Sequence, residues 1–175
     1  VLLVASVGLG VGFLLIAVAG VNAVNTQNGR YAWLSTGNAA TADKAAKTSA
    51  DPLWWLIRAD RFDGQLIGRI DVAATEPTSP VPPGIGHLPG PGQYYASPAL
   101  AELLRRTPAD QLAGRYPGHL IGSIGDAALP SPNSLLIVIG RTADQLARTP
   151  GAVRATGIAT TPPSGQPRVA DFIIE

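Results

Sequence analysis

The residues of this chain that could do catalytic chemistry together are Ser123, His119 and Asp126, which stand close to one another in one short segment. A serine, a histidine and an aspartate are the members of a catalytic triad, but a triad is defined by its geometry in space, so closeness in sequence is weak support. The Gly-x-Ser-x-Gly pattern of a nucleophile elbow is absent. We therefore predict no hydrolase site, and we expect Asp126 to cap the turn that follows a strand.

Nucleotide and metal sites are not indicated either. The chain has no GxxxxGK[ST] segment, which a P-loop for ATP requires. Its two histidines, His87 and His119, are widely separated, and there is no cysteine, whereas a metal site needs three or four converging donors. The sequence thus predicts no catalytic residue, no cofactor and no metal, which is typical of a chain that is not an enzyme.

Two aromatic pairs, Trp54-Trp55 and Tyr94-Tyr95, are the candidate contact residues. If these side chains are exposed, they could form a patch for a partner or an apolar ligand; if they are buried, they belong to the core. Successive side chains of an extended segment point to opposite faces. We therefore expect one residue of each pair to point inward.

The charge balance excludes one large class of function. The formal net charge is +1, and only 14% of the residues are charged. A nucleic-acid-binding protein normally carries a stripe of Lys and Arg that neutralises phosphates, and no such cluster is present. We therefore expect no nucleic-acid partner.

The elements that would position any site begin with an apolar segment. Residues 1–24 carry no ionisable side chain, and the first one is Arg30. A helix of this length rises about 36 Å, which is enough to cross a hydrocarbon core of about 30 Å. The sequence predicts a transmembrane helix over 1–28 in contact with membrane lipid, with Tyr31 and Trp33 in an aromatic belt. The alternative is a cleaved signal peptide, although such peptides have a basic start and a shorter apolar stretch.

A stalk and one folded domain are predicted after this span. The Ala-rich segment with scattered charges predicts a polar helical stalk over 29–50. The order of strands and helices that follows predicts one α+β domain with a mixed sheet over 51–168. The apolar end, 169–175, is interpreted as the approach to a second transmembrane helix. The predicted strands are 65–75, 119–125, 134–140 and 152–160, and the third should be buried on both faces.

Short helices and Pro/Gly-rich loops connect these strands. Ser97-Pro98 and Thr107-Pro108 each provide an N-cap and a proline at the first helical position, so each predicts a helix. Thr142 and Gln145 form a capping box for a third helix. The segment 76–92 is so rich in proline and glycine that it is predicted to be a loop.

Three short motifs in the second half of the chain resemble a known family. The motifs are PGxxYxSPAL, PGxxxGxIGDxxL and a Pro-Asn turn that leads into a buried strand ending in Gly-Arg. Together they are similar to the extracytoplasmic, MacB-like domain of actinobacterial FtsX-like ABC transporter permeases, over most of Asp51 to Thr161. The matching residues are Pro91, Gly92, Tyr95, Ser97, Pro98, Ala99, Leu100, Pro117, Gly118, Gly122, Ile124, Gly125, Asp126, Leu129, Pro132, Asn133, Gly140 and Arg141.

The resemblance implies a role in transport across the cell membrane. It implies a cytoplasmic N-terminus, an extracytoplasmic domain between the first two transmembrane helices, a separate ABC ATPase subunit as partner and a possible permease dimer. Such permeases act in export or in mechanical transmission. This chain lacks the later transmembrane helices and the coupling elements of the family, so it is interpreted as a fragment of a permease subunit.

Two other classes of protein stay open. The chain could be a membrane-anchored extracytoplasmic binding or sensor domain, or a secreted structural domain with its signal peptide attached. The sequence by itself does not identify a transported substance.

Overall fold

The computed structural model describes residues 30, 32–37 and 49–161. The predicted transmembrane helix over 1–28, most of the predicted stalk and the segment 169–175 lie outside these residues. In the part of the chain that is described, no helix is both long and apolar enough to cross a membrane.

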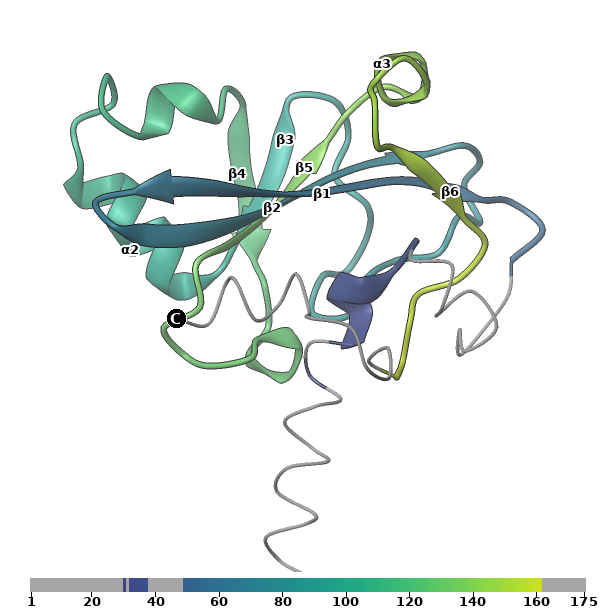
Figure 1. Ribbon diagram of the computed structural model, residues 1–175, viewed down its shortest axis with the longest axis horizontal. Coiled ribbons are helices and arrows are strands. Elements are labelled where there is room, and N and C mark those ends of the chain that lie inside the picture. The colour runs from purple at the N-terminus through teal and green to yellow at the C-terminus, as the bar shows by residue number, and fades with distance from the viewer. Residues whose placement is uncertain (1–29, 31, 38–48, 162–175) are drawn as a thin grey trace, which may run out of the picture.

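A single six-stranded sheet organises the described residues (Figure 1). The order of its strands is β4-β3-β5-β2-β1-β6. Strands β2 and β5 pair in parallel, as do β3 and β4, whereas the other pairs are antiparallel. The mixed sheet and the few short helices confirm the predicted α+β class. The strands are β1 Leu53–Phe62, β2 Gln65–Ala74, β3 Gln93–Ala96, β4 His119–Ser123, β5 Leu136–Gly140 and β6 Val153–Ala155.

The helices are short; η1 precedes the first strand in the chain, and the others lie in the connections between strands. The α-helices are α2 Pro98–Arg106 and α3 Ala143–Ala147, and the 3-10 helices are η1 Ala32–Ser35, η3 Ala113–Arg115 and η4 Asp126–Ala128. Ser97 caps α2 by accepting a hydrogen bond from the backbone of Leu100, and Thr142 and Gln145 form the predicted capping box of α3. The two helix starts at Ser97 and Thr142 are therefore confirmed.

The two longest strands, β1 and β2, form a hairpin, and only the second of them is among the predicted strands. All ten residues of β1 pair with β2, from Leu53 opposite Ala74 to Phe62 opposite Gln65. The turn between them is Asp63-Gly64, and both residues have positive φ, 48° and 75°, as the commonest two-residue hairpin turn requires. Strand β1 is not among the predicted strands, because charged and apolar side chains are mixed along it.

Strand β5 is the centre of the sheet. All five of its residues are buried, and it pairs in parallel with β2 on one side and antiparallel with β3 on the other. A strand covered on both faces must be apolar throughout, so its continuous apolar sequence was sufficient to predict its place.

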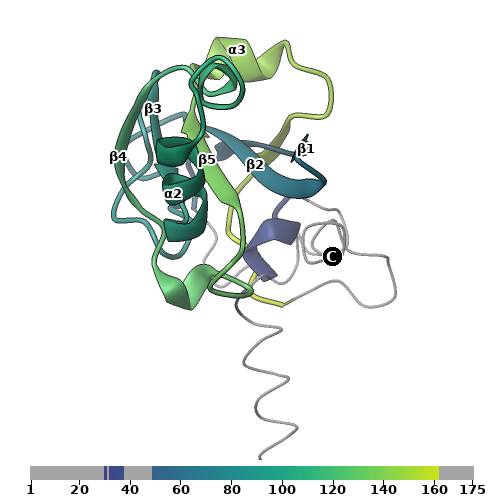
Figure 2. The same cartoon turned by 90° about the vertical axis from the view of Figure 1, so that its left-hand side faces the viewer.

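The two faces of the sheet are covered by different elements (Figure 2). On the loop face, Trp33 and Leu34 of η1, Ile85 and Leu88 of the loop 76–92 and Ala128 of η4 pack against the sheet. On the helix face, α2 packs with Ile67, Ile137 and Ile139, and Leu146 of α3 packs with Leu56 and Ala73. The helix face therefore has two separate apolar clusters, one under each helix.

Three predicted features are corrected by the structure. The helix expected from Thr107-Pro108 does not form: one turn follows Pro108, Leu112 leaves the helical conformation at φ −133°, and only η3 follows. Burial of Leu112 in the α2 cluster outweighs the weak helical tendency of so short a segment, which contains Gly114. The strand expected over 152–160 is only β6, three residues long.

Trp33 is the third correction, because it is not a belt residue facing lipid. It is 2% exposed in the core of the loop face, and its indole N–H donates to the carbonyl of Ala128 at 2.9 Å. Pairing with this distant carbonyl satisfies the polar atom, so the ring can be fully buried.

Candidate functional site

The candidate site lies on the helix face, between the two apolar clusters. Along β2 the side chains on this face are Ile67, Arg69, Asp71 and Ala73, because alternate residues of a strand share a face. Ile67 belongs to the α2 cluster and Ala73 to the α3 cluster. Two charged residues therefore separate two apolar regions of the sheet.

Asp71 is the centre of this site. It is 1% exposed, and its carboxylate accepts hydrogen bonds from Arg69 on the same strand, Nε to Oδ2 at 2.9 Å and Nη2 to Oδ1 at 3.1 Å. Arg141 donates its Nε to Oδ1 at 2.6 Å. Because a buried charge is tolerated only when it is paired and hydrogen-bonded, the two guanidinium groups account for the burial of this carboxylate.

Arg141 reaches Asp71 because of the way β5 ends. The backbone N–H of Arg141 donates to the carbonyl of Val72 at 2.8 Å, which extends the parallel pairing of β2 and β5 by one residue. The preceding residue, Gly140, has no room for a side chain, because a Cβ there would overlap the carbonyl oxygen of Gly90. The lack of a side chain at Gly140 thus lets β5 pass close to Gly90, and the next residue, Arg141, reaches Asp71.

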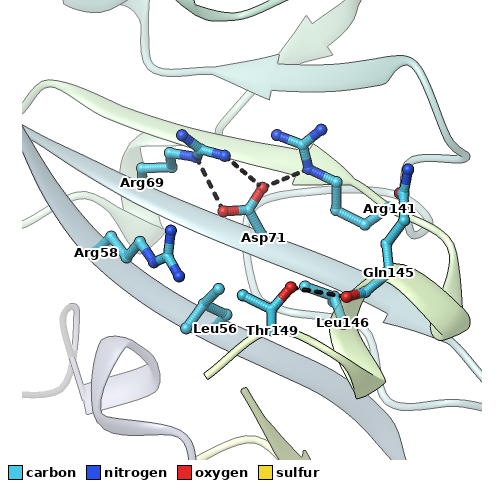
Figure 3. A pocket seen from close by; sticks show the side chains of 8 residues that line it. All are labelled: Leu56, Arg58, Arg69, Asp71, Arg141, Gln145, Leu146 and Thr149. Carbon is cyan, nitrogen blue, oxygen red and sulfur yellow. Dashed lines mark hydrogen bonds and ion pairs between the residues drawn. The ribbon is translucent and has the colours of Figure 1, made fainter. Parts of the chain in front are cut away.

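A hollow of about 260 Å³ opens beside the carboxylate (Figure 3). Arg58 of β1 borders it, directly opposite Arg69 in the hairpin register. The hollow is also bordered by Leu56 of β1 and by Gln145, Leu146 and Thr149 of α3 and the residues after it. We call this space, with Arg58, Arg69, Asp71 and Arg141, the arginine hollow.

The arginine hollow carries an excess of positive charge. Its lining has three guanidinium groups and one carboxylate, which leaves two positive charges. Asp71 engages two of the three arginines. Arg58 is exposed, and among the described residues no carboxylate lies within ion-pair distance of it.

A second carboxylate lies at the far side of Arg69. Asp60 is 4.0 Å from Nη1 of Arg69, and it accepts a hydrogen bond from the hydroxyl of Tyr116 at 3.0 Å. Burial of the phenol, followed by the charge of Asp60 and this hydrogen bond, raises the pKa of Tyr116 well above its usual value. Burial and Asp60 together favour the protonated form of the Tyr116 phenol. Asp60 is not among the residues that line the hollow.

The predicted contact residues do not form one site. Trp55 and Tyr95 are 1% and 6% exposed in the core of the loop face, whereas Trp54 and Tyr94 are half-buried on the helix face. One residue of each pair therefore points into the loop-face core, as the alternation predicted. Trp54 lies under the guanidinium of Arg154, 5.9 Å from its ring centre. Their role in binding a partner stays a prediction.

The structure does not join Ser123, His119 and Asp126 into a catalytic site. Ser123 and His119 are at opposite ends of β4, and the hydroxyl of Ser123 donates at 3.4 Å to the carbonyl of Ile124. Asp126 is the first residue of η4, whose N-cap is Gly125 and which has no side-chain cap. The expectation that Asp126 caps this turn is therefore wrong. Among the described residues no group of three metal-ligating side chains occurs.

Sequence reasoning missed the arginine hollow although a signal was present. Arg58 and Asp60 have the same spacing as Arg69 and Asp71, an arginine followed two residues later by an aspartate. In strands this spacing places both side chains on one face, so the two pairs predict adjacent charged rows once both strands are recognised. The sequence alone did not indicate this site, because β1 is not among the predicted strands.

Comparison of the chain with protein-family models, with curated proteins and with solved structures finds no match.

Proposed function

We propose that this chain is the first part of an FtsX-like ABC transporter permease subunit. In this proposal the described domain is extracytoplasmic, the segment 1–28 is the first transmembrane helix, and a separate ATPase supplies energy for export or mechanical transmission. The domain acts by contact and movement and catalyses no reaction.

One observation supports this proposal most: the three motifs of the resemblance meet in one structural unit. Gly92 and Gly118, the second residues of the first two motifs, lie against each other where β3 and β4 begin. The backbone N–H of His119 donates to the carbonyl of Gly92 at 2.8 Å, and a Cβ on Gly118 would lie 2.5 Å from that carbonyl oxygen. The absence of a side chain at Gly118 is thus needed for this parallel pairing, whereas Gly92 has room for a Cβ but a φ of +78°, which favours glycine.

The first motif also joins the third. The hydroxyl of Ser97 donates to the carbonyl of Ser134 at 2.6 Å and accepts from the backbone N–H of Leu136 at 3.1 Å. It therefore holds the start of α2 against the start of β5. At the other end of β5, Arg141 of the third motif reaches Asp71. Residues of the three motifs thus contact one another in the fold. This supports treating the motifs as one pattern, as the resemblance to the permease domain requires.

A specific observation favours a second candidate, a membrane-anchored binding or sensor domain. The arginine hollow is a concave site with unpaired positive charge, which a domain with a purely mechanical role does not need. This candidate shares the membrane anchor and the outward orientation with the permease but has no ATPase partner.

Copurification with an ABC ATPase tests the permease proposal. The whole membrane protein is expressed with the candidate ATPase, purified by a tag on the permease and reconstituted in lipid vesicles. We expect the ATPase to copurify and its ATP hydrolysis to rise on association. A correctly folded preparation that neither retains nor stimulates the ATPase would favour the sensor domain.

Orientation is tested with a single introduced thiol, because the chain contains no cysteine. Asn133 is exposed in the turn before β5, so we expect Asn133→Cys to react with a membrane-impermeant maleimide on intact cells. Ala96→Cys is the matched control, because Ala96 is 0% exposed and should react only after denaturation. Labelling of Asn133→Cys only after lysis would contradict an extracytoplasmic domain.

A further inference from the structure

The third arginine of the arginine hollow has no structural explanation among the described residues. Arg69 and Arg141 neutralise and satisfy the buried Asp71, so a purely structural ion cluster would be complete without Arg58. Arg58 instead stands directly opposite Arg69 in the hairpin. Like charges at directly opposite positions of an antiparallel pair destabilise a sheet, so this arrangement requires another reason.

The guanidinium groups of the other two arginines, Arg69 and Arg141, are held in place by Asp71 before any ligand binds. Asp71 bonds Nε and Nη2 of Arg69 and only Nε of Arg141, and its own burial fixes the position of both groups. A guanidinium has five N–H donors, so both arginines keep donors for a further acceptor. Planar, pre-oriented guanidinium groups are the usual ligands of phosphate oxygens.

The charge and size of the hollow indicate the ligand class. Two positive charges are left in the lining after Asp71 is counted, and one is left after Asp60, 4.0 Å from Arg69 outside the lining, is also counted, so the hollow suits an anion. The volume of about 260 Å³ is just below the range of about 300–1,000 Å³ typical of pockets for drug-sized ligands. Leu56 and Leu146 add an apolar side to the lining. A phosphate group on a small organic residue satisfies all three features.

We propose that the arginine hollow binds the phosphate dianion of a phosphomonoester, with Arg58, Arg69 and Arg141 as its ligands. The bound dianion lies between the two positive charges of Arg58 and Arg69 and so reduces their repulsion. It also links β1 to the end of β5. The phosphate can belong to a dissolved molecule or to a lipid headgroup. This inference goes beyond the proposed function and does not depend on it.

The test uses the full chain in detergent micelles and measures binding by calorimetry, with thermal unfolding as a second readout. The probes are phenyl phosphate, inorganic phosphate and benzoate, all at one ionic strength adjusted with chloride. We expect saturable binding of both phosphates and a rise of the melting temperature with their concentration, because a ligand of the folded state stabilises it. Benzoate, a monoanion, should bind at least about tenfold more weakly.

Two arginine variants provide the matched comparison. Arg58→Gln should weaken binding of phenyl phosphate by at least about tenfold while the melting temperature without ligand stays the same or rises. Arg106→Gln removes the same charge from the exposed end of α2, outside the lining, and should change the affinity by less than about twofold. Equal losses in the two variants would indicate only a general charge effect and would overturn the proposal.

A competition experiment separates the two sources of the phosphate. Nanodiscs that contain phosphatidic acid should displace inorganic phosphate from the chain if a lipid headgroup is the ligand, and nanodiscs of phosphatidylcholine alone should not. Undiminished phosphate binding in both nanodiscs would assign the site to a dissolved phosphomonoester. Absence of saturable phosphate binding, or equal affinity for benzoate, would overturn the proposal. None of these measurements involves an ATPase, so their failure is distinct from failure of the permease proposal.

Discussion

Arg141 donates its Nε to Oδ1 of Asp71 at 2.6 Å, although the two residues are 70 positions apart in the chain. Asp71 is on β2, and Arg141 directly follows β5, the parallel neighbour of β2. The contact therefore exists only when the central pairing of the sheet has formed. It links the stability of the core to the geometry of the arginine hollow.

Replacement of Asp71 should destabilise the fold strongly. In Asp71→Asn the side chain keeps its shape but loses its charge, so two guanidinium groups lose their carboxylate. Removal of one partner of a buried ion pair typically costs about 3–5 kcal/mol, and we expect the lower end because the side chains of Arg69 and Arg141 are 21% and 26% exposed. Urea unfolding measures the change. Asp110→Asn, at an exposed position, should stay within about 0.5 kcal/mol of the native chain; equal effects would contradict the role of Asp71.

Ser97 should contribute to stability through its hydroxyl alone. Ser97→Ala removes the donor to Ser134 and the acceptor for the backbone of Leu136, both in a fully buried place. Buried polar groups left without partners cost about 1–3 kcal/mol, which chemical denaturation can measure. The control is Ser123→Ala on the exposed edge strand, where we expect little change. A small effect of Ser97→Ala would contradict this role of the Ser97 hydroxyl.

The two core tryptophans should respond differently to the same substitution. Trp33 and Trp55 contact each other edge to face, with ring centres 6.0 Å apart. The Trp33 indole N–H donates to the carbonyl of Ala128, whereas that of Trp55 has no hydrogen-bond partner among the described residues. Because both changes to Phe remove the same volume, Trp33→Phe should destabilise more than Trp55→Phe by about 1 kcal/mol. Thermal and urea unfolding compare the two, and the reverse order would refute the inference.

We expect the free energy of unfolding to fall in alkaline solution because of Tyr116. Its pKa is raised in the folded chain by burial and by Asp60, so the folded state holds the phenolic proton more tightly than the unfolded state. The stabilisation is complete below the unfolded pKa of about 10 and declines as the pH rises above it. Unfolding measured between neutral and alkaline pH should show this decline, and Tyr116→Phe should flatten it. Tyr94→Phe leaves the Tyr116–Asp60 pair intact and should retain the decline.

The strongest local signals were sufficient to predict several elements. Ser97-Pro98 and the Thr142–Gln145 capping box start helices through bonds within one turn, and the apolar segment of β5 identifies a strand covered on both faces. The segment from Thr107 failed for a non-local reason: burial of Leu112 under α2 decides its conformation, and no local pattern contains that contact. Strand β1 was not predicted because apolar and charged side chains are mixed along it without a clear alternation.

The sequence by itself determined the α+β class, the central strand, two helix starts and the inward and outward alternation of Trp54-Trp55 and Tyr94-Tyr95. These features depend on periodicity and on contacts within a few residues, and both can be recognised in the sequence alone. Only the tertiary structure decided that Trp33 belongs to the core and that Arg58, Arg69 and Arg141 surround one hollow. The physical reason is strand register: the pairing of β1 with β2 and of β2 with β5 brings these charges together, and register follows from the packing of the whole sheet.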